Sequence, residues 1–252
     1  MTMQAAATDA QAGSNNAVHT ELGSPALAGG ELAAISPKFA EGYARIRDVT
    51  DRDGACPAWA KALYMACAAA VRCQPEQTLR EMTRSRELGL SLSDARGASL
   101  AVLISRGEAT YNAFARAIDQ AFDIAADQST EPIPDFTLDR QAALDYFQSY
   151  FGFVPDYIEV MADNAPRALE GYVLMRQWSL AENMLDAKHV ELLLCTINAA
   201  EFSSRFVNIH ANGARNAGAT EAEITEAVVC AIPISGVASW LPGADGIMEG
   251  RQ

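Results

Sequence analysis

The sequence lacks the features that mark nucleic-acid-binding and membrane proteins. Its 252 residues carry 32 acidic and 19 basic side chains, a formal net charge of −13, and no cluster of lysine and arginine. Nucleic acids and anionic membranes are bound by a concentrated positive face, so this charge argues against both as partners. No apolar run approaches the roughly 20 residues that span a bilayer. The N-terminus lacks the charged and apolar stretches of a secretory signal, so we expect a cytoplasmic protein.

Disulfide and metal-ligand patterns are missing as well. The five cysteines occur without a CxxC pair or a zinc-like spacing to histidine, at Cys56, Cys67, Cys73, Cys195 and Cys230. This argues against a disulfide framework and a zinc site. We expect small buried thiols in a reducing compartment, and a protein that uses no metal and no cofactor.

Strand-forming patterns are scarce, whereas helix-forming patterns fill the chain. We find no alternating run of β-branched or aromatic residues bounded by turns. The Ala/Leu-rich segments 57–73 and 186–202 are long enough for about three to four helical turns each. A second helix follows each segment and ends at Gly89 or Gly218, where a left-handed C-cap fits. We therefore expect an all-α protein.

The chain repeats itself at a constant offset of 129 residues. The stretch "SPKFAEGYARIR" from Ser36 returns as "APRALEGYVLMR" from Ala165, and matched glycines and aromatics keep this register over about 75 residues. A Thr220–Glu223 capping box in the second copy has a weaker equivalent, Ser91–Asp94, in the first. We interpret residues 36–115 and 165–244 as two copies of one helical unit, packed as a pseudo-dimer.

This interpretation divides the chain into four parts. Residues 1–35 are expected to form a mobile tail, 36–123 a degenerate first repeat, 124–140 a linker, and 141–252 the second repeat with the functional site. Two short aromatic-rich helices are expected at the start of the second repeat, before residue 165, where the first repeat has only the polar tail.

A carboxylate and an imidazole are the strongest candidates for chemistry. Glu191 lies among apolar residues of one predicted helix, and His210 lies on the apolar face of the next. Such groups are costly to bury alone and tolerable together, and as a pair they suit general acid/base catalysis. The same spacing also fits a purely structural core pair. The first copy has Ala62 and Glu81 at the matching positions, so only the second copy carries the pair.

Further candidates surround this pair. Ser203 is either a helix N-cap or a hydrogen-bond donor, and Arg205 is either a surface charge or the cation that binds a substrate carboxylate. Arg176 is a second candidate for that role, although it recurs with the scaffold, as does Tyr172. Four aromatic residues suggest a planar or aromatic-derived ligand, although each also suits a core: Phe202, Phe206, Trp178 and Trp240.

These residues together resemble the alkylhydroperoxidase D / carboxymuconolactone decarboxylase superfamily. The resemblance rests on the ordered set Pro166, Tyr172, Glu191-Leu-Leu, His210-Ala, Gly218-Ala-Thr, Glu223-Ile-Thr-Glu-Ala and Gly236-Val-Ala. It covers the second copy almost wholly and the first more faintly. It implies an all-α fold whose units pair and trimerise, so that three tandem chains would imitate a hexamer. It also implies sites close to unit contacts, where Glu81 or other first-copy residues could take part.

The sequence departs from the patterns of both the peroxidase-type and the decarboxylase-type members of that family. Ser203 and Phe206 occupy the positions of the two peroxidase thiols, which argues against thiol peroxidase activity. Phe206 also stands where decarboxylase-type members have a glutamate, four residues before the histidine. Redox sensing through Cys67 and Cys73 is disfavoured, because neither occupies a thiol position of the family.

We therefore expect a cofactor-independent lyase of the carboxymuconolactone decarboxylase type that acts on a small organic acid or lactone. His210, oriented by Glu191, would move the proton in a decarboxylation or a related elimination or isomerisation. Ser203 would donate to an oxyanion, and substrate binding would fall to Arg205, Arg176, Tyr172 and Phe206. The alternative is a non-catalytic binding or assembly protein on the same scaffold. In either case we expect a homo-oligomer, a trimer of tandem chains.

Overall fold

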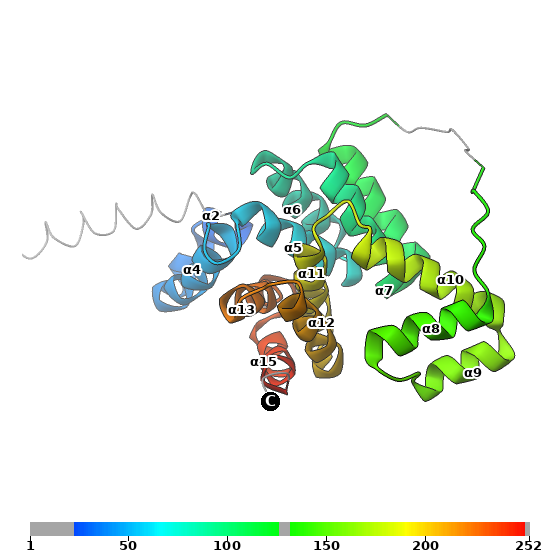
Figure 1. The fold of residues 1–252 in the computed structure, drawn as a ribbon. Coiled ribbons are helices and arrows are strands. Elements are labelled where there is room, and N and C mark those ends of the chain that lie inside the picture. The colour runs from blue at the N-terminus through cyan, green and yellow to red at the C-terminus, as the bar shows by residue number, and fades with distance from the viewer. Residues whose placement is uncertain (1–22, 126–131, 250–252) are drawn as a thin grey trace, which may run out of the picture.

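The computed structural model describes residues 23–125 and 132–249, and every regular element among them is helical (Figure 1). This confirms the all-α prediction. No helix in these two ranges combines the length and the apolar character that crossing a bilayer requires.

The first half of the chain contributes six helices to the described part. They are α2 (Pro25–Ala28), α3 (Glu31–Ile35), α4 (Pro37–Asp51), α5 (Ala58–Val71), α6 (Pro75–Glu87) and α7 (Leu92–Ala121). The second half contributes α8 (Arg140–Phe151), α9 (Asp156–Asn164), α10 (Pro166–Arg176), the π-helical turn η1 (Gln177–Ala181), α11 (Ala187–Ala200), α12 (Ser204–Asn216), α13 (Glu221–Val229), α14 (Ile232–Ser235), the 3-10 turn η2 (Val237–Ser239) and α15 (Trp240–Glu249).

Helix boundaries and backbone turns recur at the offset of 129 residues. The bounds of α5 and α6 return as those of α11 and α12, and the starts of α4 and α7 return as those of α10 and α13. Three pairs of residues with positive φ angles obey the same offset: Cys73 with Phe202, Gly89 with Gly218, and Gly107 with Gly236. These correspondences support the interpretation of two related helical units.

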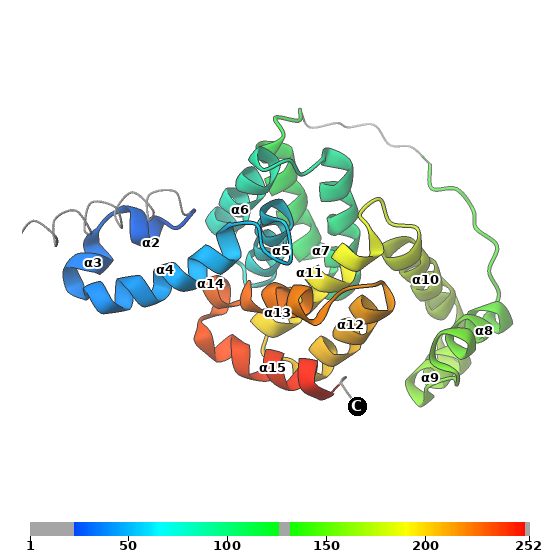
Figure 2. The same ribbon diagram turned by 60° about the vertical axis from the view of Figure 1, so that its left-hand side comes forward.

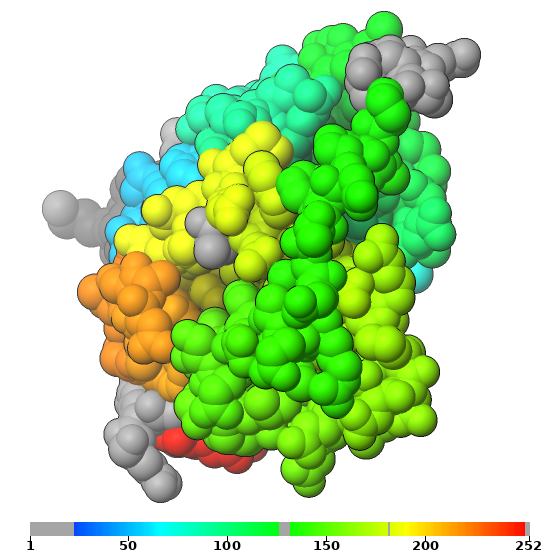
Figure 3. All heavy atoms as spheres, turned by 45° about the vertical axis from the view of Figure 1, so that its right-hand side comes forward, coloured from blue at the N-terminus to red at the C-terminus, as the bar shows by residue number. Residues whose placement is uncertain are grey.

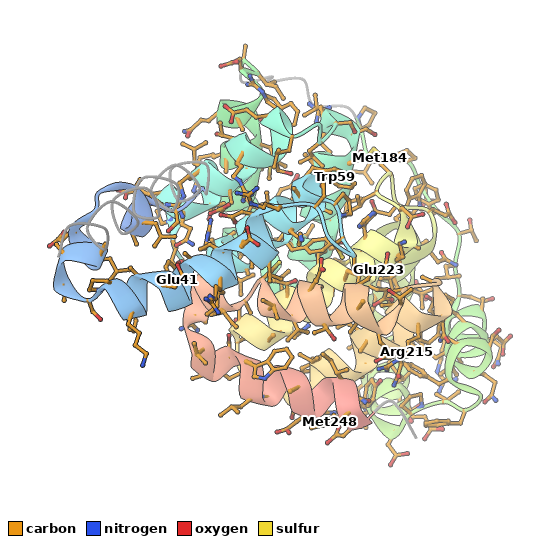
Figure 4. The ribbon with its side chains drawn as sticks, turned by 90° about the vertical axis from the view of Figure 1, so that its left-hand side faces the viewer. Glu41, Trp59, Met184, Arg215, Glu223 and Met248 are labelled. Carbon is orange, nitrogen blue, oxygen red and sulfur yellow. The ribbon has the colours of Figure 1, made fainter. Side chains whose placement is uncertain are left out.

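Capping follows the sequence signals at matched helix starts. Thr220 accepts a hydrogen bond from the Glu223 backbone N–H, and the Glu223 carboxylate accepts one from the Thr220 backbone N–H, which completes the predicted box. Glu223 is labelled at α13 in Figure 4. Ser91 accepts from the Asp94 backbone N–H at the start of α7. The chain therefore enters α7 and α13 through the same N-cap hydrogen bond, and only α13 has the complete box.

Helices α5 and α11 pack against each other at the centre of the molecule (Figure 2). Nearly all their side chains are buried, as expected of helices that are apolar all round. A smaller, separate core joins α8, α9 and α10 through Ala143, Phe147, Ile158, Ala162, Leu169 and Val173. The α8–α10 segment therefore has its own packing and lies beside the main body (Figure 1).

The boundaries of the predicted tail and linker differ in part from the structure. Residues 25–35, which we assigned to the tail, form α2 and α3, and the tail prediction for residues 1–22 lies outside the described residues. Gly23 is fixed because its N–H donates to Asp51 Oδ2 at 3.0 Å and its carbonyl accepts from Arg47 Nη2 at 3.1 Å. Residues 132–139 have no regular structure, as expected of a linker.

Candidate functional site

Helices α11 and α12 bring Glu191 and His210 into contact. The two helices form a hairpin whose turn contains Phe202 at φ 61°, and the Nδ1 atom of His210 lies 2.8 Å from Glu191 Oε2. The side chains of His210 and Glu191 are 19% and 10% exposed, respectively. Because an ionised carboxylate only accepts hydrogen bonds, Nδ1 donates here, and Nε2 is left for the cavity that His210 lines. This contact fixes the orientation of the ring.

A glycine on α12 makes room for the carboxylate of this pair. A Cβ atom at Gly213 would lie 2.5 Å from Oε1 and 2.7 Å from Oε2 of Glu191. No real Cβ atom approaches a neighbour so closely, so Gly213 is required for Glu191 to reach His210 in this geometry.

His210 borders a cavity of about 300 Å³ between the α8–α10 segment and the main body. The lining residues come from α7 to α12 and are Ile104, Ser105, Arg106, Phe151, Tyr157, Tyr172, Arg176, Ser179, Leu180, Leu194, Asn198, Phe206, Ile209 and His210. Figure 3 shows the green α8–α9 segment lying against the yellow and orange surface of the second unit. The cavity is therefore small, largely apolar, and provided with two arginines and one imidazole.

Arg176 places an unpaired cation in this cavity. Its guanidinium carbon lies 4.6 Å from the ring centre of Tyr150 and 5.8 Å from that of Tyr172. Burial acts to lower the pKa of Arg176, but hydrogen bonds with Tyr146 and Tyr172 outweigh it and raise the pKa, so the group stays charged. Among the described residues, no Asp or Glu forms an ion pair with it, and its buried Nε has no hydrogen-bond acceptor. The site thus favours an anionic ligand.

The first unit also reaches the cavity, through Arg106. This residue precedes Gly107, whose φ of 76° breaks the α7 helix, and its Nη2 donates to Asn198 Oδ1 at 2.8 Å. Arg106 also forms an ion pair with Glu201, and its buried Nε has no acceptor among the described residues. We did not predict Arg106 from the sequence. Gly107, which follows Arg106 and recurs as Gly236, was the sequence feature that could have indicated a break in the helix at this position.

The structure brings most of the predicted site residues together. One cavity is lined by Tyr172, Arg176, Phe206 and His210, and Glu191 accepts the hydrogen bond from Nδ1 of His210. Ser203 lines an adjoining cavity, which shares Arg106, Asn198 and Phe206 with the first. It is the N-cap residue of α12, although its side chain makes no capping hydrogen bond.

Arg205, in contrast, is exposed on α12 and lines neither cavity. It lies five residues before His210, which turns it about 140° away around the helix. Of the two arginines proposed for substrate binding, Arg176 is therefore the one beside His210.

The matching position in the first unit has different chemistry. Glu81, which corresponds to His210, is fully buried and lies 3.5 Å from Arg47, 3.4 Å from Arg84 and 3.2 Å from Arg80. It joins an ion-pair network in its own unit and does not line the second-unit cavity, where we had considered a role for it. The described parts of the chain contain no group of three or more His, Cys, Asp or Glu side chains suited to a metal ion.

Comparisons relate both the sequence and the fold to known proteins. Residues 166–245 match the model of the carboxymuconolactone decarboxylase family, and this range contains Arg176, Glu191 and His210. A crystal structure from Burkholderia xenovorans LB400, described as a candidate gamma-carboxymuconolactone decarboxylase subunit, aligns with a TM-score of 0.58 and 18% identity over 92% of each chain. At this identity the likeness shows a common fold. A comparison with curated protein sequences gives no match.

Proposed function

We propose, from the membership of residues 166–245 in the carboxymuconolactone decarboxylase family, that this chain is a cofactor-independent lyase that decarboxylates a small organic acid. The proposal rests on one observation. The cavity holds both Arg176, which has no ion-pair partner among the described residues, and His210, whose ring is oriented by Glu191.

Arg176 is suited to hold a substrate carboxylate. Its planar guanidinium matches two carboxylate oxygens, and the rings of Tyr150 and Tyr172 lie beside it. An anion bound there would lie beside His210 and would give Arg176 the ion-pair partner that it has from no Asp or Glu among the described residues.

His210 is suited to deliver the proton. When the bond to the departing carboxylate breaks, its electron pair stays on the substrate and CO2 leaves. The imidazolium then donates its Nε2 proton to the carbon, and a proton from solvent restores it, so that the net reaction consumes one proton for each CO2 formed. Glu191 stabilises the charged ring through the 2.8 Å hydrogen bond to Nδ1.

Arg106 is better placed than Ser203 to stabilise negative charge on a substrate oxygen. Arg106 lines the same cavity as His210, whereas Ser203 lines the adjoining one. Glu201 and Asn198 hold the guanidinium in place, and such preorganised donors act most strongly on charge that develops during the reaction. We therefore assign this role to Arg106.

The test compares three variants in a thermal-shift screen and in a CO2-release assay with the acids that bind. Binding raises the unfolding midpoint according to RT ln(1 + [L]/Kd). We expect Arg176→Gln to lose the shift, and His210→Gln to keep the shift but lose CO2 release. The exposed Arg205→Gln serves as the matched control and should behave as the wild type.

Undiminished CO2 release by His210→Gln would overturn the proposed mechanism. If acids bind through Arg176 and no CO2 is released from any of them, the alternative of a non-catalytic binding protein takes its place. That alternative is favoured by the direct contact between Glu191 and His210, because a structural core pair would make the same hydrogen bond.

A further inference from the structure

Aromatic side chains are concentrated on one side of the cavity. Phe151, Tyr157 and Tyr172 come from α8, α9 and α10, and Phe206 joins them from α12. The aliphatic lining residues come mostly from the main body: Ile104, Leu180, Leu194 and Ile209. The aromatic wall is thus supplied mainly by the α8–α10 segment.

Packing inside the α8–α10 segment holds this wall in place. Phe147 is fully buried in the segment's core, and its ring is stacked on Phe151 at 6.2 Å with an interplanar angle of 7°. The same ring contacts Tyr172 at 5.5 Å. Rings that are fixed before a ligand arrives lose little further entropy when it binds.

Two of the wall residues are exposed. Tyr157 is 56% exposed and Phe206 is 49% exposed, and both line the cavity. Exposed apolar surface that is gathered around a cavity marks a binding site more often than a core. The rings therefore have free faces that a ligand can cover.

We propose that the ligand of this site is a planar aromatic monocarboxylate, with its carboxylate on Arg176 and its ring against Phe151, Tyr157, Tyr172 and Phe206. This inference rests on the proposed role of Arg176. A cavity of about 300 Å³ is at the lower limit of ligand pockets and suits an acid with one ring. A flat ring that packs against these aromatic side chains gains edge and face interactions with them, whereas a saturated ring of equal size is thicker and gains neither.

The experiment measures the dissociation constants of benzoate and cyclohexanecarboxylate by calorimetry. The two acids have the same number of carbon atoms and the same charge at neutral pH. We expect benzoate to bind the wild type about three- to tenfold more tightly, because aromatic pairs favour each other by roughly that factor. Tyr157→Leu and Phe206→Leu should bring this ratio close to one without abolishing the binding of cyclohexanecarboxylate. Phe153→Leu, which changes an exposed ring outside the cavity, is the matched control.

The outcomes distinguish a failure of the aromatic assignment from a failure of the proposed role of Arg176. If both acids bind equally well to the wild type and Arg176→Gln abolishes both, the carboxylate clamp stands and the aromatic assignment is wrong. If neither acid binds, both the clamp and the aromatic assignment are overturned. Because the substituted rings are exposed, we expect the leucine variants to stay folded, and circular dichroism would verify this.

Discussion

Replacing Gly213 with alanine tests whether the Glu191–His210 contact depends on space at one position. The added Cβ would lie 2.5 Å from Glu191 Oε1, so the carboxylate must shift from its present position. We expect the hydrogen bond between Nδ1 and Oε2 to be lost, and with it the fixed orientation of the ring. Gly42→Ala is the matched control, because Gly42 also lies within a helix and a Cβ atom there would meet no atom outside its own helix within 4 Å.

The magnitude follows from two opposing contributions to the free energy of unfolding. A Gly-to-Ala change inside a helix stabilises by about 1 kcal/mol, so Gly42→Ala should raise the melting temperature by about 2–4 °C. In Gly213→Ala, the same gain is offset by the loss of a hydrogen bond to a charged group, which costs about 1.5–3 kcal/mol. Gly213→Ala should therefore be less stable than the wild type by about 0.5–2 kcal/mol.

Two measurements decide the outcome. Thermal unfolding gives the stability difference, and the 15N chemical shifts of the His210 ring report whether Nδ1 still carries the proton. We also expect CO2 release to fall about tenfold or more, which corresponds to at least about 1.4 kcal/mol of lost transition-state stabilisation. If Gly213→Ala is as stable as Gly42→Ala and the ring keeps its tautomer, the steric reasoning is refuted.

Three further predictions concern ionisable groups outside the cavity. Burial acts to raise the pKa of Glu226, but hydrogen bonds from two backbone amides, including that of Cys56, and from Lys61 lower it. Because the unfolded chain then holds more protons, the free energy of unfolding should decrease as pH falls below about 4.5. Urea unfolding should show that Glu226→Gln costs about 2 kcal/mol at pH 7 and removes part of this pH dependence. Burial lowers the pKa of His189, so stability should fall as pH drops below 6.5, and His189→Gln should weaken that fall in urea titrations. A thiol reagent should modify the exposed Cys73 rapidly in the native protein, while Cys56, whose pKa burial raises to about 12, should react only on unfolding.

Local sequence rules predicted much of the fold because each signal acts within a few residues. The Thr220–Glu223 spacing specified a capping box, and Gly218 adopted the positive φ angle that a C-cap needs. The Glu191–His210 contact was predictable for a related reason. Both residues lie on consecutive helices that form a hairpin, and their apolar neighbours force the two polar groups to meet.

Residues brought in from distant elements could not be predicted in the same way. Arg106 is 92 residues from Asn198, and only the tertiary structure places it in the cavity. Helical geometry explains why Ser203 and Arg205 are less well placed than Phe206. Ser203 shares the face of His210 but lies about 10 Å away along the axis, whereas Phe206 is only four residues before the histidine on that face.

The contrast between Arg47 and Arg176 explains why we propose a site in the second unit. The two arginines are related by the offset of 129 residues. Arg47 is buried and satisfied, with Asp51 at 3.0 Å and Glu81 at 3.5 Å. The positions that correspond to these carboxylates carry Leu180 and His210. Because neither residue supplies a negative charge, the arginine that joins an ion network in the first unit has no ion-pair partner among the described residues of the second, where it lies beside an imidazole. This difference is the reason for proposing an acidic ligand in the second unit.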